Sequence, residues 1–236
     1  MRSLAIIPAR GGSKRLIKKN LRLLGGKPLV CHTLDAAVLS NQFTRIILSS
    51  DDSEILDLSK RCEYVTPEIR EERLSGDKVT VLTLINEIAN RAEVKQYFDV
   101  IALLLPTCPF RNAEHIKNGF NMLTRQIDGV ISLTQYEFPP QLGVTLENEM
   151  IKPVFDPCPL ITGNTRSQDQ SVILRPNGGF YIQWMDKFLV NQNFWKGYVK
   201  GYIMDRMDSI DIDNELDLEY AEFLLKKKKR NNGEST

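Results

Sequence analysis

The sequence predicts a single α/β domain built as three layers around a mostly parallel sheet. Short apolar runs alternate with amphipathic segments of about ten residues, which is the pattern of repeated βαβ units. The most apolar run, residues 100–105 (VIALLL), has the composition of a strand buried on both faces. The 236 residues, of which 42% are hydrophobic and 26% charged, suit one globular domain of ordinary size.

The predicted elements follow one another in a regular order. Strands are expected at residues 4–7, 46–48, 64–65, 100–105, 129–133, 179–182 and 202–204. Helices are expected at residues 29–39, 53–61, 80–91, 113–123 and 216–225. Ligands of open α/β sheets lie at the carboxyl ends of the strands, so the loops after Ile7, Leu48 and Leu105 should share one rim.

The alternation stops between residues 138 and 175. Five prolines interrupt this stretch, and polar residues fill positions 162–171. Long irregular segments inside compact domains are usually functional or disordered, so we expect a lid, a hairpin arm or a dimerisation element here. Residues 226–236, which begin with a basic run, are expected to form a frayed, solvated tail.

The first predicted strand runs into a Gly-containing turn with excess positive charge, within residues 4–22 (LAIIPARGGSKRLIKKNLR). No Asp or Glu precedes Asp35, whereas the same 34 residues carry eight Lys and Arg. Gly lets the backbone approach a ligand and expose N–H groups. Five cations could then neutralise phosphate oxygens: Arg10, Lys14, Arg15, Lys18 and Lys19. The turn fits neither the P-loop nor the G-x-G-x-x-G pattern, and a solvated basic face is the simpler alternative.

Acidic residues near the C-terminus could complete a polyphosphate site. If residues 209–213 are extended, the two isoleucines face the core and Asp211 and Asp213 share the other face, with Cα atoms about 6.6 Å apart. Mg²⁺ typically binds one or two such carboxylates together with substrate phosphates. The alternative is a helix start capped by Asp213 or Asn214, which explains Asp213 but leaves Asp211 without a role.

Composition disfavours several other classes of protein. The net charge of +1 indicates a local anionic ligand rather than a coat of nucleic acid. The four cysteines form no CxxC pair, as expected for reduced thiols. No apolar run reaches the roughly 18 residues of a membrane span, so we expect a cytoplasmic protein with no membrane partner. His32 and His115 lie in predicted helices without a partner motif, which disfavours a cysteine or histidine hydrolase.

The motifs resemble, in order and spacing, those of the acylneuraminate cytidylyltransferases, the CMP-sialic acid synthetases and their relatives acting on legionaminic or pseudaminic acid. The matching segments are ARGGSKRLIKKN, Arg70 followed by LSGD, LLLPTCPFR, RPNGGFYI and DSIDIDNELDLEYAE. The resemblance covers about residues 3–225 and implies a Rossmann-like fold of the nucleotidyltransferase type. It implies that CTP and a nine-carbon 2-keto sugar acid, a nonulosonic acid, give the CMP-sugar and pyrophosphate with Mg²⁺ or Mn²⁺. It also implies a homodimer that exchanges an arm, here residues 138–175, so that both subunits line each pocket.

The same resemblance assigns roles to individual residues. It implies that Arg10, Lys19 and Asp211 are catalytic and that Asp211 and Asp213 bind the metal. Nucleotide-binding residues are expected at Pro8, Ala9, Arg10, Gly11, Ser13, Lys14, Asn20, Arg70 and Asp77. Sugar-binding residues are expected at Leu105, Thr107, Arg166, Gln168, Asn177, Tyr181, Phe194 and Trp195. For the pair Phe194 and Trp195, simple core packing is the alternative.

Two departures from the family pattern bear on the sugar. Leu105 stands where many sialic acid enzymes have Gln, and residues 166–171 (RSQDQS) lack one Arg and the Leu-Pro of the usual RRQDLP. We therefore expect a deoxygenated, diacetamido sugar such as a legionaminic acid in preference to N-acetylneuraminate. The alternative enzyme makes CMP-Kdo or another sugar nucleotide. The non-enzymatic alternative is a basic module that binds nucleotides or nucleic acid, which leaves the paired aspartates unexplained.

Overall fold

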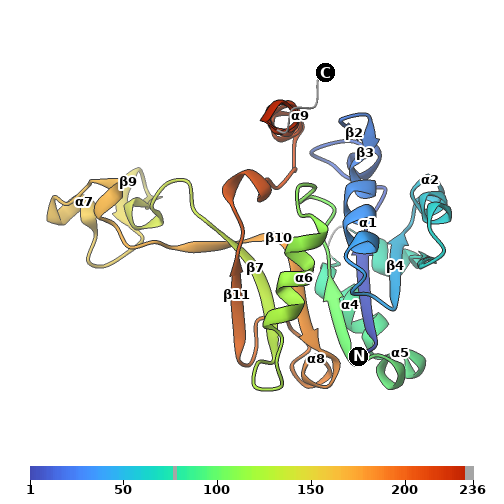
Figure 1. Ribbon diagram of the computed structural model, residues 1–236. Coiled ribbons are helices and arrows are strands. Elements are labelled where there is room, and N and C mark those ends of the chain that lie inside the picture. The colour runs from blue at the N-terminus through green and yellow to red at the C-terminus, as the bar shows by residue number, and fades with distance from the viewer. Residues whose placement is uncertain (77–78, 232–236) are drawn as a thin grey trace.

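A seven-stranded sheet with strand order β11-β7-β10-β6-β1-β4-β5 forms the centre of the molecule (Figure 1). The computed structural model describes residues 1–76 and 79–231. The strands are β1 Ser3–Pro8, β4 Arg45–Ser50, β5 Val65–Ile69, β6 Val100–Leu103, β7 Gly129–Gln135, β10 Leu174–Trp184 and β11 Val199–Ile203. Only β10 runs antiparallel to its neighbours β6 and β7, so the predicted mostly parallel sheet is confirmed.

Helices cover both faces of this sheet. Five correspond to predicted ones: α1 Leu29–Leu39, α2 Ser53–Asp57, α4 Val81–Ala89, α6 Ala113–Met122 and α9 Glu215–Asn231. Three further helices of the body, which the sequence analysis missed, are short: α3 Glu72–Ser75, α5 Ala92–Tyr97 and α8 Met185–Asn191. No helix in the described ranges is long and apolar enough to cross a membrane.

The alternation of side chains along β1 produces the three layers. Ala5 and Ile7 belong to the core cluster beneath α1 and α6, whereas Leu4 and Ile6 belong to the cluster beneath α4 and α8. All four are fully buried, as expected for a central strand covered on both faces.

The last helix is longer than predicted. The expected frayed tail is wrong for Lys226–Arg230, because α9 continues through Asn231, and the rest of the predicted tail, residues 232–236, lies outside the described residues. Lys and Arg are good helix formers, and positive charge near a helix C-terminus complements its dipole. A third apolar cluster fixes α9 against the N-terminal segment, and it includes Leu16, Leu24, Leu218 and Leu224.

The Pro-rich segment leaves the body as an arm (Figure 1, left). It contains the hairpin β8 Val144–Glu147 and β9 Met150–Pro153, the short helix α7 Pro159–Thr162 and two 3-10 turns at Pro140–Leu142 and Ser167–Asp169. All residues of β8 and β9 are exposed. The expected excursion from the sheet is therefore a projecting arm, and its role in dimerisation stays a prediction.

Candidate active site

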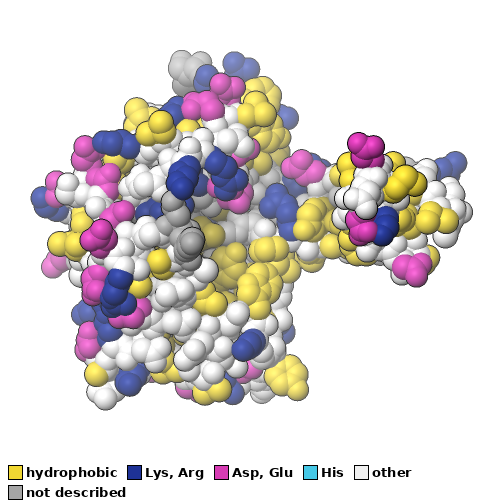
Figure 2. Space-filling model, turned by 180° about the vertical axis from the view of Figure 1, so that it is seen from behind, with side chains coloured by type: hydrophobic (Ala, Val, Ile, Leu, Met, Phe, Trp, Pro, Cys, Tyr) yellow, Lys and Arg dark blue, Asp and Glu magenta, His cyan; other side chains and the backbone are white. Residues whose placement is uncertain are grey.

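A cleft of about 340 Å³ opens at the carboxyl ends of β1, β5 and β6. The basic turn contributes Pro8, Arg10, Lys19 and Asn20; the loop after β6 contributes Leu105, Pro106 and Thr107; and Asp211 and Asp213 close another side. The two charged segments therefore face each other across one cleft, as the sequence predicted. The face of the molecule seen in Figure 2 carries an apolar area in the middle of the body with Lys and Arg side chains above it.

Only part of the basic turn faces this cleft. Arg10 and Lys19 line it, and Asn20 donates a 2.8 Å hydrogen bond from Nδ2 to the Arg10 carbonyl. Lys18 instead contacts Glu54 of α2, with 3.2 Å between Nζ and both carboxylate oxygens. The excess positive charge of the sequence is thus partly met by acids from distant segments.

The backbone N–H groups of Ala9 and Gly11 donate to other parts of the protein, and the role of these residues in binding the nucleotide stays a prediction. The Gly11 N–H donates to Asp51 Oδ1 at 2.7 Å, and the N–H of the buried Ala9 donates to the Ser49 carbonyl at 2.9 Å. A Cβ at position 11 would lie only 2.8 Å from the Cβ of Asp52, so glycine permits this close approach. Ser13 and Lys14 are not among the residues that line the cleft.

The segment that carries the acid pair is irregular rather than a strand. Ile212 is fully buried, and its N–H donates to the Thr107 carbonyl at 2.8 Å, which ties the segment to the loop after β6. Asn214 caps α9, because its Oδ1 accepts the N–H of Asp217 at 3.0 Å. Capping therefore does not occupy the Asp213 carboxylate, which accepts from Lys19 Nζ at 2.9 Å and from Arg15 at 2.7 Å.

The two aspartates have opposite pKa shifts. Desolvation of its carboxyl group raises the pKa of Asp211, and the negative charge of Asp213 adds to this against a hydrogen bond from Thr107. Desolvation also acts to raise the pKa of Asp213, but the hydrogen bond and charge of Lys19 outweigh it and hold that pKa below its usual value. The charge of ionised Asp213 is thus balanced within the protein, whereas additional positive charge would stabilise the ionised form of Asp211.

This donor set fits a hard divalent cation shared with a ligand. No group of three or more His, Cys, Asp or Glu side chains with metal-binding geometry occurs in the described part of the chain, so the protein offers no complete cage. Mg²⁺ usually binds through one or two carboxylates, with phosphates and waters filling the remaining positions. The unbalanced Asp211 carboxyl beside Asp213 meets that requirement.

Arg70 completes the cationic side of the cleft. Its Nη2 donates to the Ser49 carbonyl at 3.0 Å, which fixes the guanidinium above the end of β4. Burial lowers the Arg70 pKa, with the negative charge of Asp51 opposing and the positive charge of Arg10 adding to the effect. Both guanidinium groups line the same cleft, and their mutual repulsion would be relieved by an anion bound between them. Asp77, predicted beside Arg70, lies outside the described residues.

An apolar pocket of about 230 Å³ continues the cleft past Val81 and Leu105, which line both. Tyr181 lies at its centre, with its ring 6.0 Å from that of Trp195 and 5.9 Å from that of Phe194. Trp195 is 54% exposed, whereas Phe194 is 3% exposed and belongs to the core cluster under α4 and α8. Core packing therefore accounts for most of Phe194, and Trp195 is the more accessible wall.

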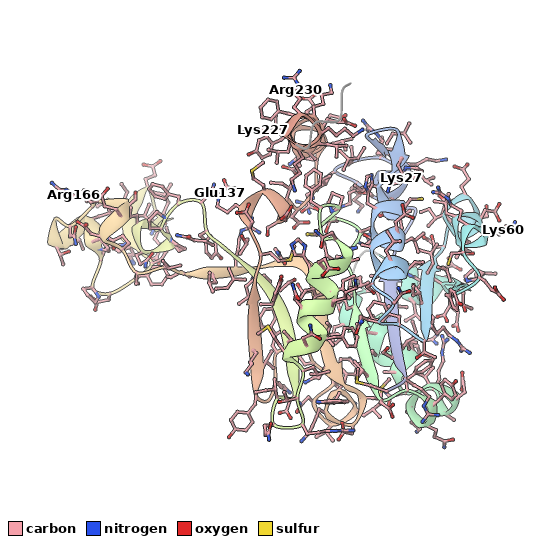
Figure 3. All side chains as sticks on the ribbon, in the orientation of Figure 1. Lys27, Lys60, Glu137, Arg166, Lys227 and Arg230 are labelled. Carbon is pink, nitrogen blue, oxygen red and sulfur yellow. The ribbon has the colours of Figure 1, made fainter. Side chains whose placement is uncertain are left out.

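Three predicted sugar-binding residues lie away from the cleft. Arg166 and Gln168 are on the arm, and Figure 3 shows Arg166 near its far end. Asn177 is buried: Oδ1 accepts from Ser132 Oγ at 2.6 Å and the Gly179 N–H at 3.1 Å, while Nδ2 donates to Ser209 Oγ at 2.8 Å. Asn177 thus stabilises the bulge of β10, where Gly178 has a φ of +73°.

Sequence reasoning missed much of the apolar wall of the cleft. Leu74, Val79 and Leu84 line it opposite the basic turn. In a sequence these residues have the same pattern as core residues, so no signal separates a cleft wall from an interior. Ser49, which follows Leu48 in the loop expected on this rim, holds Arg70 through its carbonyl.

Comparison with known proteins identifies the family. A family model described as cytidylyltransferase matches residues 4–173. The chain belongs to the cytidylyltransferase family. The curated relatives that this cytidylyltransferase matches include the CMP-N,N'-diacetyllegionaminic acid synthase of Legionella pneumophila, at 32% identity over 95% of this chain and 97% of the relative. They also include the pseudaminic acid cytidylyltransferase of Campylobacter jejuni serotype O:2, at 30% identity over 96% of this chain and 97% of the relative.

The fold of this cytidylyltransferase also occurs in solved structures. One is a CMP:2-keto-3-deoxy-manno-octonic acid synthetase complexed with CTP, with a TM-score of 0.69 at 14% identity, covering 97% of this chain and 100% of the other. Another is the 4-diphosphocytidyl-2C-methyl-D-erythritol synthase of Anaerococcus prevotii, with a TM-score of 0.67 at 16% identity, covering 95% of this chain and 96% of the other. The Rossmann-like nucleotidyltransferase fold expected from the sequence is thereby confirmed.

The position of Arg70 predicts a role in binding CTP. Replacing Arg70 with Met should raise the dissociation constant for CTP about 10- to 100-fold, because a hydrogen bond to a charged group contributes about 1.5–3 kcal/mol. Isothermal titration with CTP alone measures this. Arg73→Met is the matched control, because Arg73 pairs with Glu71 and Glu87 outside the cleft. Equal dissociation constants for the two variants would remove Arg70 from the nucleotide site.

Proposed function

We propose that this cytidylyltransferase transfers CMP from CTP to a nonulosonic acid and releases pyrophosphate. The observation that carries the proposal is full-length similarity to enzymes named for legionaminic and pseudaminic acid. The cleft supports it chemically, because cations and a carboxyl group whose pKa is raised by desolvation face each other at the carboxyl ends of the strands. The anomeric hydroxyl of the sugar attacks the α-phosphorus of CTP. The bond between the α-phosphorus and the oxygen that bridges it to the β-phosphate breaks, and pyrophosphate leaves.

The side chains of the cleft divide this task. Arg10 and Arg70 bind the triphosphate from one side and neutralise charge that builds on its oxygens. Lys19, which is 14% exposed and held by Asp213, presents a fixed ammonium group toward the α-phosphate and the departing pyrophosphate. A side chain already fixed by packing and an ion pair loses little entropy when the transition state forms.

Asp211 and Asp213 would hold a divalent metal, Mg²⁺ or Mn²⁺. When bound, such an ion supplies positive charge to the phosphate oxygens. Desolvation raises the pKa of Asp211, and the charges of Lys19 and Arg175 offset this only in part, so added positive charge would stabilise the carboxylate. Thr107 donates to the Asp211 carboxyl group and so orients it toward the cleft.

The apolar pocket beside the cleft suits the sugar. Leu105, Tyr181 and Trp195 offer apolar surface and few hydrogen-bond partners. Burial, followed by the nearby charge of Asp211, raises the pKa of the Tyr181 hydroxyl to about 12, so it stays protonated and can donate to a sugar oxygen. A sugar with methyl and acetamido groups in place of hydroxyls leaves fewer polar groups unpaired here. We therefore propose a diacetamido legionaminic acid as the preferred substrate.

We propose that the arm forms a homodimer and completes the partner's sugar pocket. Its exposed side chains include Val144, Leu146, Met150, Ile151, Val154, Phe155, Leu160 and Ile161. Apolar surface concentrated on a thin projection stabilises little of its own chain and suits an interface. Arg166 and Gln168 near the end of the arm would then reach the pocket of the other subunit.

The metal proposal predicts the behaviour of Asp211→Ala. Its turnover with CTP, Mg²⁺ and a panel of nonulosonic acids should fall at least about 10²-fold, because charge on the phosphates is no longer neutralised. Pyrophosphate release measures turnover, and the product mass identifies the sugar and separates CMP-Kdo synthesis. Glu219→Gln, an exposed acid on α9, is the control. Full activity of Asp211→Ala with an intact fold would contradict the metal role.

The substrate proposal predicts the effect of Leu105→Gln. An added amide should raise the ratio of kcat/KM for N-acetylneuraminate over diacetyllegionaminate by about tenfold, because it can pair with a sugar hydroxyl that leucine leaves unpaired. Steady-state kinetics with both sugars measure the ratio. A wild-type protein that prefers N-acetylneuraminate, or an unchanged ratio in the variant, would overturn the assignment.

The arm-exchange proposal predicts complementation between two inactive variants. A mixed dimer of Asp211→Ala and Arg166→Ala contains one pocket in which both residues are intact. After mixing and refolding, about half of the dimers are mixed, and each mixed dimer has one competent site of two. Mixing should therefore restore up to about one quarter of the wild-type activity. Light scattering reports the dimer mass. A monomer in solution, or no recovery on mixing, contradicts the exchange.

A further inference from the structure

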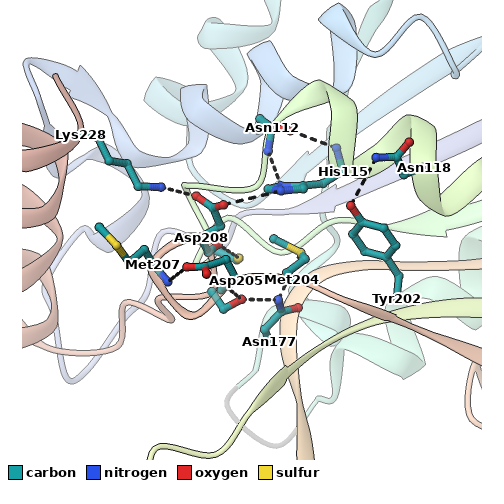
Figure 4. A network of polar contacts seen from close by, with 12 residues as sticks. Asn112, His115, Asn118, Asn177, Tyr202, Met204, Asp205, Met207, Asp208 and Lys228 are labelled. Atoms are coloured by element: carbon teal, nitrogen blue, oxygen red, sulfur yellow. Dashed lines mark hydrogen bonds and ion pairs between the residues drawn. The ribbon is translucent and has the colours of Figure 1, made fainter. Parts of the chain in front are cut away.

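A polar cluster surrounds Asp208, in the turn that precedes the acid pair along the chain (Figure 4). The 3-10 turn Arg206–Asp208 immediately precedes the segment that carries Asp211. The Asp208 carboxylate accepts a hydrogen bond from Lys228 of α9, and its other oxygen lies 3.7 Å from Nε2 of His115 on α6. The side chains of Asp208, Lys228 and His115 are 24%, 28% and 14% exposed, so the cluster is largely shielded from water.

The hydrogen bonds of His115 define the charge balance of this cluster. Its Nδ1 accepts the N–H of Asn112 at 3.3 Å, which completes a capping box and leaves the proton on Nε2, toward Asp208. Burial lowers the pKa of His115, with the charge of Asp208 opposing this effect, so the ring is neutral at neutral pH. Lys228 is therefore the cation that balances Asp208.

Lys228 also contacts the other loop that lines the cleft. Its Nζ lies 4.6 Å from the centre of the Phe110 ring, a cation–π contact. Phe110 belongs to the loop after β6, in which Thr107 lines the cleft and accepts the N–H of Ile212. One side chain from the end of α9 thus touches both segments that set the position of Asp211.

The remaining contacts of the turn do not replace this one. Ser209 accepts from Asn177 Nδ2 at 2.8 Å, and Cys108 Sγ lies 3.5 Å from the Asp208 carbonyl. These contacts fix the backbone on the side of the sheet, but they leave the Asp208 carboxylate without a counter-charge. A shielded carboxylate that loses its cation is costly to keep in place, so the turn would shift toward water.

We infer that Lys228 is a positioning residue for catalysis. It holds the turn at Asp208 and the loop at Phe110 in fixed positions. These positions place Asp211 and Thr107 at the cleft. The inference rests on the proposed function for its kinetic consequence. Its structural consequence, a fixed 205–213 segment, can be measured without any turnover. The end of α9 thereby acquires a role that its basic composition alone does not reveal.

The test compares Lys228→Met with Lys227→Met, which removes the same charge from an exposed position one residue away (Figure 3). For Lys228→Met we expect kcat for pyrophosphate release to fall about 10- to 100-fold, with KM for CTP changed less than about threefold, because Arg10, Lys19 and Arg70 remain in place. Amide hydrogen exchange should speed up in residues 205–213 and 107–112 and stay unchanged in β1 and β4. Lys228→Arg should restore most of the kcat, and Lys227→Met should match the wild type.

A second variant guards against misfolding. Asp208→Asn keeps the shape of the side chain and removes the charge, and the double variant with Lys228→Met should be no slower than the slower single variant, since both remove one interaction. Equal kcat and exchange in Lys228→Met and Lys227→Met would overturn the inference. So would exchange that speeds up uniformly over the sheet, which indicates a general loss of stability. If the wild type turns over none of the sugars, the proposed function fails, and the exchange pattern alone decides the positioning role.

Discussion

The ion pair between Lys19 and Asp213 joins residues 194 positions apart and determines the form of the cleft. It connects the turn after the first strand to the segment before the last helix. A second ion pair, between Arg22 and Glu215, strengthens this contact between the two ends of the chain, which we call the seam. Beneath these pairs, Leu24 and Leu224 belong to one apolar cluster. The charges alone would contribute little at a surface, so the apolar packing holds the two ends together and the ion pair sets their register.

The ion pairs of this seam reduce the positive charge that the basic N-terminal segment can offer to a ligand. Its charge looks uncompensated in the sequence because the acids that pair with it lie in distant segments, at Glu54 and near the C-terminus. Asp213 pairs with both Lys19 and Arg15, and Glu54 pairs with Lys18, so the net positive charge that a polyanion meets is smaller than the composition suggests. A segment paired in this way serves a local site better than an extended nucleic-acid surface.

The sequence was sufficient for the elements with strong periodicity. Helix α1 begins and ends where predicted, and β1 and β4 differ by only a few residues, because central elements must be apolar on the faces that they bury. The short helices α3 and α5 lack enough turns to produce a periodic signal. The cleft was predictable where charge marked it, at Arg10, Lys19 and Asp211. It was not predictable at Gly11, whose N–H is taken by Asp51, nor at Asn177, whose buried hydrogen bonds depend on the β10 bulge.

The contrast between Asp211 and Asp213 explains why two acids are needed at this position. A single aspartate could not both anchor Lys19 and present a carboxyl group that stands outside every ion pair. Asp213 does the first, and its lowered pKa keeps it ionised beside the ammonium group. Asp211 does the second: Thr107 donates a hydrogen bond to its carboxyl group, and no ion pair among the described residues involves it, although the charges of Lys19 and Arg175 act on it. The protein thus satisfies one carboxylate and leaves its neighbour two residues away in a state that positive charge from outside the chain stabilises.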